Sequence, residues 1–170
     1  RAKELARSLD SNAELVCAML SAEGSALRQL NLSRCLTKHH ANAIADAIAA
    51  NPKSALQSLD LSGSKFDETG WSNIAEKVIR TNTTLTTLKI NEVGAIGNRS
   101  AFLIAESLRS NTTLTDLGNC AGWCCDGEIY MITENLLRRN RGEGPAPFLS
   151  EDCSDLASAS YCTCLGLGLG

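Results

Sequence analysis

The chain has 170 residues, a length that suits one domain of ordinary size better than two. Its composition is 44% hydrophobic and 21% charged, with 13 glycines and 3 prolines, which excludes a wholly disordered or collagen-like protein. The net charge of −3 argues against nucleic-acid binding and against a polybasic membrane-surface site. No apolar run approaches the roughly 18 residues that a membrane-spanning helix needs, so we expect no direct membrane span.

The start of the chain bears on its location. No secretory signal peptide is visible, and the chain begins at Arg1 without an initiator methionine, so we interpret it as a fragment or a processed product. We expect an intracellular, cytoplasmic protein. An organellar location stays open because a targeting segment could have been removed.

Residues 1–26 predict a partial N-terminal repeat or a helical cap. The phrase Leu5-Ala6-Arg-Ser-Leu9, followed by Asn12, has the pattern of the end of a helix. The next stretch, Ala13 to Glu23, is rich in strong helix formers, and Gly24 is a suitable stop.

Residues 27–142 are dominated by a repeated phrase. Leucines recur every 29 residues, and each opens the spacing L-x-x-L-x-L, whose last two apolar positions alternate as in a half-buried strand. The four opening residues are Leu27, Leu56, Leu85 and Leu114. The side chains expected to point into the core are Leu30, Leu32, Leu59, Leu61, Leu88, Ile90 and Leu117.

A second phrase follows each predicted strand after a loop. Apolar residues four apart, with a small residue beside the first, are typical of one face of a helix. These phrases begin at Ile44, Ile74, Ile104 and Ile132, and each runs toward an asparagine at Asn51, Asn82, Asn111 and Asn140. Asparagine tolerates the left-handed backbone that commonly closes a helix, so we expect each helix to end there.

The last repeat departs from this pattern. Asn119 stands where the three earlier repeats have an apolar residue, so either the ladder of strands ends there or the strand is re-registered. After Arg141 the periodicity vanishes, and residues 143–170 form a Gly- and Cys-bearing tail that we expect to be irregular.

These phrases resemble the leucine-rich repeat, and the full helix with its closing asparagine resembles the ribonuclease-inhibitor-like subclass. Cys35 falls where that consensus takes asparagine or cysteine. The resemblance covers Leu27 to Asn140. It implies an α/β leucine-rich repeat solenoid of about four repeats of about 29 residues, with parallel strands on the concave face and helices on the convex face.

On such a fold, the polar residues between the buried leucines would lie on the concave face, where folding does not require them to be apolar. They are therefore free to bind a partner, as the resemblance implies. The candidate partner-binding residues are Gln29, Asn31, Ser33, Ser58, Asp60, Ser62, Thr87, Lys89 and Asn91. This face carries charges of both signs and no aromatic residue, so contacts through the helices or the tail remain an alternative.

The cysteines and histidines give no strong chemical signal. The chain has 8 cysteines, and the spacings of Cys120 to Cys124 and Cys162 to Cys164 differ from the C-x-x-C of a zinc knuckle. A metal site or a disulfide-stapled cap is conceivable there, but we interpret these residues as reduced thiols. The adjacent pair His39-His40 near Cys35 lacks an orienting third group, so we expect no catalytic residue, no metal and no cofactor.

We therefore predict a non-enzymatic module that binds a protein partner through its surface. One alternative is an architectural subunit embedded in a large multiprotein complex. A further alternative is a regulator of a small GTPase, since one activating-protein family shares the fold and acts through a loop arginine, to which Arg34 is loosely comparable.

Overall fold

The computed structural model describes residues 13–91, 96–118 and 127–144. Residues 13–21 are helical, in agreement with the helix predicted over 13–23. The elements that follow are β1 (Gln29–Asn31), α2 (Ala41–Ala50), β2 (Ser58–Asp60), α3 (Glu68–Asn73), the π-helix η1 (Ile74–Ile79), β3 (Thr87–Lys89), α4 (Asn98–Ser110) and α5 (Gly127–Asn140). Strand and helix thus alternate along most of the described chain.

The three strands form one parallel sheet in the order β1-β2-β3. Leu30 pairs with Leu59, and Leu59 pairs with Leu88, so the sheet register follows the 29-residue period of the sequence. The predicted core ladder is confirmed, because every member is buried except Leu30, which is half-buried on the edge strand.

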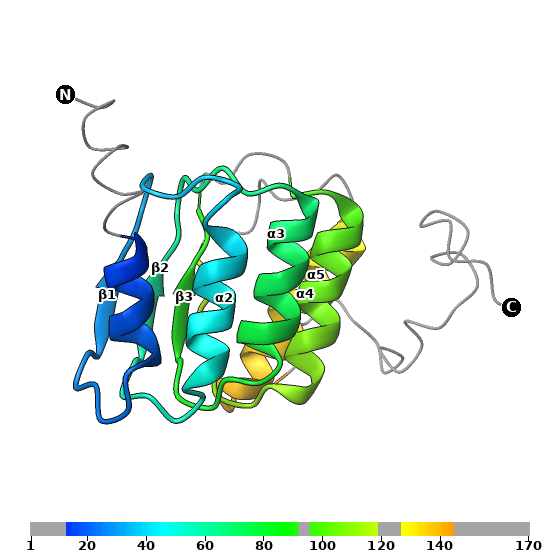
Figure 1. The fold of residues 1–170 in the computed structure, drawn as a ribbon. Helices are drawn as coiled ribbons and strands as arrows, with labels where there is room; N and C mark the ends of the chain where they lie inside the picture. The colour runs from blue at the N-terminus through cyan, green and yellow to red at the C-terminus, as the bar shows by residue number, and fades with distance from the viewer. Residues whose placement is uncertain (1–12, 92–95, 119–126, 145–170) are drawn as a thin grey trace, which may run out of the picture.

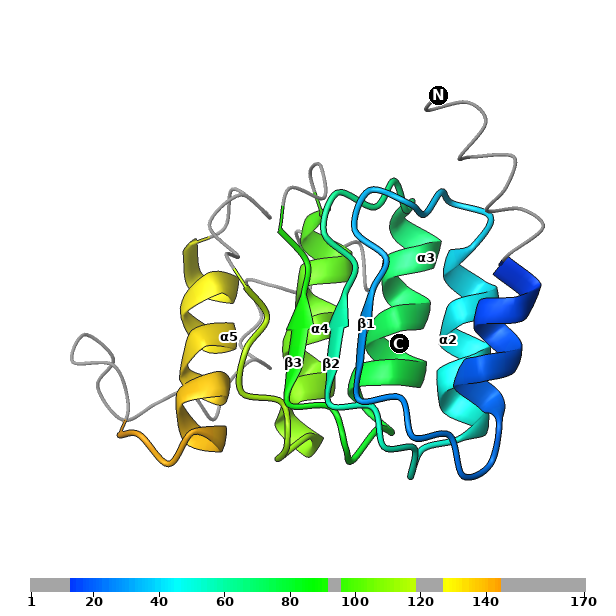
Figure 2. The same ribbon diagram turned by 90° about the vertical axis from the view of Figure 1, so that its left-hand side faces the viewer.

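Helices α2, α3 with η1, and α4 lie side by side along the sheet, and α5 packs beside α4 (Figures 1 and 2). Small residues set the close approach of α2 to α3. A Cβ added at Gly70 would lie 2.8 Å from the Cβ of Ala41, so this contact requires glycine. The carboxylate of Asp67 caps α3 by accepting a hydrogen bond of 2.9 Å from the Gly70 amide.

The helices end near the predicted asparagines, but not for the predicted reason. Asn51 and Asn111 cap the C-termini of α2 and α4 with φ angles of −131° and −85°, outside the left-handed region. The only described residue other than glycine with a positive φ is Arg34. The asparagines instead use their side chains to bond neighbouring backbone, as Asn111 does toward Ile79 and Asn82.

The structure corrects the predicted fold class. The repeated phrases predict a leucine-rich repeat solenoid of about four repeats, whereas the described residues contain a small open sheet of only three parallel strands, accompanied by helices. The fourth phrase forms an isolated bridge between Thr87 and Asp116 instead of a strand. The physical reason lies in the local sequence: Gly118 takes a φ of +74°, and a polar residue, Asn119, follows it at the position where the earlier phrases have an apolar one. Asn119 itself lies outside the described residues.

Candidate partner-binding face

The predicted binding residues lie in rows across the sheet. Gln29, Ser58 and Thr87 occupy neighbouring positions of the parallel register, and so do Asn31, Asp60 and Lys89. Because the leucine between them on each strand points into the core, these side chains point to the opposite, open face of the sheet. The third row, Ser33, Ser62 and Asn91, follows the strand ends, where the Asn91 amide donates a hydrogen bond of 3.2 Å to Ser62 Oγ.

Local hydrogen bonds hold part of this open face in place. The side-chain oxygen Oδ1 of Asn31 accepts a hydrogen bond of 2.8 Å from the Ser33 amide, and Oδ1 of Asp60 accepts one of 2.9 Å from the Ser62 amide. Gln29, Asn31 and Lys89 are exposed, whereas the other members of these rows are half-buried. The open face therefore presents short, fixed polar groups with one long cation among them.

Three basic side chains lie in the loops that follow β1 and β2, at the edge of the sheet where these strands end. Arg34, Lys38 and Lys65 are exposed, and we call them the basic rim. Sequence reasoning singled out Arg34 but missed the two lysines, because loop residues follow neither the strand period nor the helix period. The only signal for them was the lack of acidic residues in segments 33–41 and 62–66.

The structure describes two of the cysteines, Cys17 and Cys35, both half-buried and without a disulfide bond. Burial raises the pKa of the Cys17 thiol. The cysteines weighed for a metal site lie outside the described residues, and within those residues no group of three or more His, Cys, Asp or Glu side chains could hold a metal ion.

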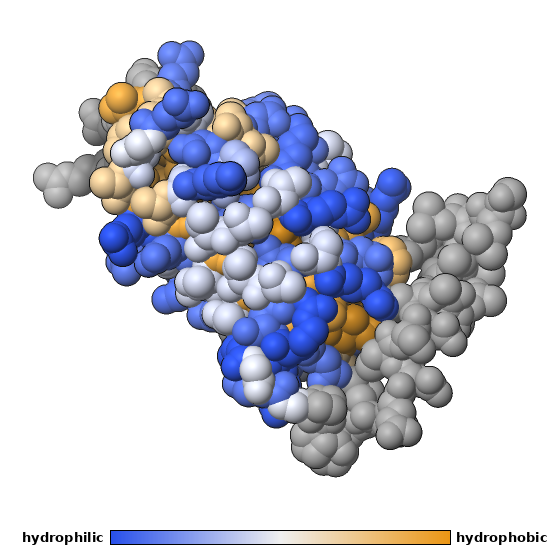
Figure 3. All heavy atoms as spheres, turned by 90° about the horizontal axis from the view of Figure 1, so that it is seen from below, coloured by the Kyte–Doolittle hydropathy of each residue, from blue (hydrophilic) through white to orange (hydrophobic). Residues whose placement is uncertain are grey.

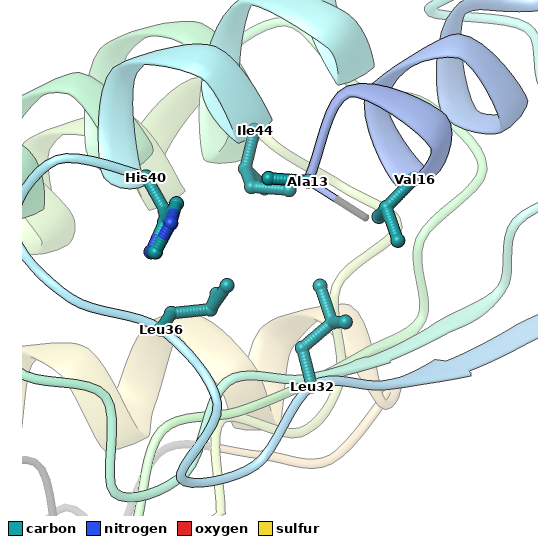
Figure 4. A pocket seen from close by; sticks show the side chains of 6 residues that line it. All are labelled: Ala13, Val16, Leu32, Leu36, His40 and Ile44. Atoms are coloured by element: carbon teal, nitrogen blue, oxygen red, sulfur yellow. The ribbon is translucent and has the colours of Figure 1, made fainter. Parts of the chain in front are cut away.

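His40 is buried, while its neighbour His39 is exposed. The ring atom Nδ1 of His40 accepts a hydrogen bond of 3.0 Å from the Thr37 amide. Its ring also lines a small apolar pocket beneath the N-terminal helical residues (Figure 4), together with Ala13, Val16, Leu32, Leu36 and Ile44. This pocket offers hydrophobic packing and little polar chemistry, so it does not supply a catalytic site.

Comparison with known proteins gives a structural match and no sequence-family match. No protein-family model matches the chain, and no curated protein does. A solved structure entitled "Leiomodin-1 Actin-Binding Site 2 (ABS2)" matches with a TM-score of 0.58 and 22% identity, over 79% of this chain and 90% of that one. A Caenorhabditis elegans tropomodulin C-terminal domain matches with a TM-score of 0.48 and 12% identity, over 77% of this chain and 94% of that one.

The match with leiomodin-1 shows the fold and corrects the predicted family. The repeated phrases resemble a leucine-rich repeat protein of the ribonuclease-inhibitor-like subclass, but the structural likeness is to the leiomodin-1 domain instead. Along the described residues, no helix has the length and apolar character to cross a membrane.

Proposed function

We propose that this chain is a non-enzymatic protein-binding domain and that its partner is actin. The observation that carries the proposal is the likeness to a leiomodin-1 domain whose title names an actin-binding site, over most of both chains. The support is therefore at the level of the fold, and the proposed binding residues rest on the geometry of this chain. The predicted cytoplasmic location would place the protein in the compartment that such a function requires.

We infer that the open face of the sheet contacts the partner. Its side chains carry hydrogen-bonding groups that the core does not use, and neighbouring positions of the register bring Asp60 beside Lys89. Opposite charges on adjacent strands can fix the orientation of a partner whose charges are complementary. The proposed contact residues are Gln29, Asn31, Ser33, Ser58, Asp60, Ser62, Thr87, Lys89 and Asn91.

Binding to purified actin tests both parts of the proposal. The wild-type protein should bind fluorescently labelled actin monomers or co-sediment with filaments. The swap Asp60→Lys with Lys89→Asp keeps the net charge but inverts the local polarity, and it should weaken binding by about tenfold or more. Circular dichroism should show an unchanged fold, because neither side chain is part of the core and the swap removes only the local hydrogen bond between the Ser62 amide and Asp60.

A matched swap lies on the helical side of the molecule. Asp46 of α2 and Lys77 of η1 form an exposed ion pair of 2.6 Å, so Asp46→Lys with Lys77→Asp makes the same exchange away from the open face. This variant should bind actin as the wild type does. No binding by the wild type would refute the actin assignment, and equal binding by both swaps would refute the assignment of the face.

A further inference from the structure

The basic rim is assembled by backbone pairing between two loops. The amide of Lys65 donates a hydrogen bond of 3.0 Å to the Leu36 carbonyl, and Thr37 pairs with Lys65 in a parallel bridge. Lys38, the next residue, is thereby held close to Lys65, although the two are far apart in the sequence. Both loops lie at the upper edge of the molecule in Figure 1, where the strands end.

The two loop segments that carry the rim, 33–41 and 62–66, hold no acidic residue of their own. Lys38 and Lys65 form no ion pair with any residue in the described part of the chain. The nearest acidic residues in the sequence are Asp67 and Glu68, which follow the second segment. The Asp67 carboxylate accepts a hydrogen bond from the Gly70 amide of α3, and Glu68 begins that helix. Glu92 lies outside the described residues.

Arg34 occupies a backbone conformation that arginine disfavours. Its φ is +59°, and the residue 29 positions later, Gly63, takes a φ of +69° at the corresponding strand end. The side chain of Arg34 extends over that glycine, because a Cβ added at Gly63 would lie 2.6 Å from Arg34 Cγ. The fold thus accepts an unfavourable backbone where glycine would fit, and such positions cluster at functional sites.

We propose that the basic rim binds an acidic segment of a protein partner. The inference rests on the proposed protein-binding role but not on actin as the partner. Charge complementarity supports it, since Arg34, Lys38 and Lys65 concentrate positive charge on a chain whose net charge is −3. That net charge also makes a protein segment a better candidate than a nucleic acid.

A titration with a short peptide of alternating Asp and Glu tests the rim without using actin. Amide chemical shifts in the ¹⁵N spectrum should change in segments 33–39 and 62–66, and the changes should shrink when salt is raised from about 20 to about 200 mM. An Asn/Gln peptide of the same length should produce none of them. The absence of shifts in these segments, or equal shifts with the neutral peptide, would overturn the proposal.

Charge-reversal variants test which residues bind the acidic peptide. Lys38→Glu with Lys65→Glu should weaken peptide binding at least about twofold, since each exposed charge contributes about 1.5- to 5-fold. Lys53→Glu with Arg80→Glu is the matched control, because these exposed residues lie beyond the C-terminal ends of α2 and η1, at the end seen in Figure 3. Equal affinity of the two variants would place the binding elsewhere, and equally tight binding of a short oligonucleotide would overturn the assignment to a protein segment.

Arg34→Gly separates binding from folding. Glycine adopts the same positive φ without strain, so the unfolding midpoint should stay equal or rise while peptide affinity falls by about 1.5- to 5-fold. A lower midpoint with unchanged affinity would show that Arg34 is structural. Peptide binding without actin binding would refute actin and leave the rim standing; actin binding without peptide binding would do the reverse.

Discussion

Buried asparagine side chains join successive strand-and-helix units at the end of the molecule where the helices finish. The amide nitrogen Nδ2 of Asn111 donates to the carbonyls of Ile79 and Asn82, at 2.7 and 3.0 Å. Its Oδ1 accepts from the amides of Thr113 and Leu114, at 3.0 and 2.8 Å. One side chain therefore satisfies backbone groups of two units that would otherwise be buried without partners.

Replacing Asn111 by alanine should lower the free energy of unfolding by about 2–4 kcal/mol, because several buried backbone groups lose their partners at once. The control is Asn51→Ala, since Asn51 is less buried and its side chain donates to the Ala22 carbonyl alone. That change should cost about 1 kcal/mol or less. Urea unfolding followed by circular dichroism measures both, and equal losses would show that the bonds of Asn111 add nothing to the unit junction.

At the scale of the element, the π-helix η1 accommodates one more residue than the corresponding segments of α2 and α4 contain. Seven residues separate the first isoleucine of the helical phrase from the asparagine in α2 and α4, as from Ile104 to Asn111, but eight separate Ile74 from Asn82. The Arg80 amide bonds the Ala75 carbonyl, five residues earlier, so the wider turn absorbs the extra residue. In α5 the asparagine also lies eight positions after the first isoleucine of the phrase, but no strand follows this helix among the described residues 141–144.

Deleting Glu76, which is exposed in η1, should therefore convert the segment to an ordinary α-helix with a small change in the unfolding midpoint. The deletion places the buried residues in the spacing that α4 already has. Deleting Glu106 from α4 removes the corresponding residue from a helix without an excess one, so it should rotate Ser107 and Leu108 out of the core. Thermal unfolding compares the two, and equal losses of stability would contradict this account of η1.

At the scale of the whole molecule, the core is continuous from the N-terminal helical residues to α5, and the leucines of β2 and β3 are fully buried in it, whereas Leu30 of the edge strand β1 is not. Leu59 on β2 is 0% exposed, while its neighbour Leu30 on the edge strand is half-buried. Leu59 thus has packed neighbours on both sides, and Leu30 has a sheet neighbour on one side only.

Leu59→Ala should cost about 2–5 kcal/mol of unfolding free energy, and Leu30→Ala clearly less, since the cost rises with the cavity left behind. Urea unfolding of both variants checks this order. A loss at Leu30 as large as that at Leu59 would mean that the edge of the sheet is covered in solution.

Much of this architecture could be predicted from the sequence, but the predicted number of strands and the predicted family were wrong. The 29-residue period gave the register of Leu30, Leu59 and Leu88, because burial on one face of a strand demands regular apolar side chains. The number of strands was wrong, since among the described residues the fourth phrase forms only a single bridge, next to Gly118 with its positive φ. The family assignment was also wrong, because a short periodic pattern of apolar residues shows which positions are buried but does not identify a protein family.

The candidate site also has a part that the sequence predicted and a part that it did not. The rows of the open face were predicted, because alternation along a strand is a local property of its residues. The pairing of the Lys38 and Lys65 loops could not be predicted, because irregular loops are placed by contacts that carry no period. The sequence by itself therefore determined which residues are buried and in what register, and only the tertiary structure decided which distant loops and amides meet, since those contacts depend on packing between units.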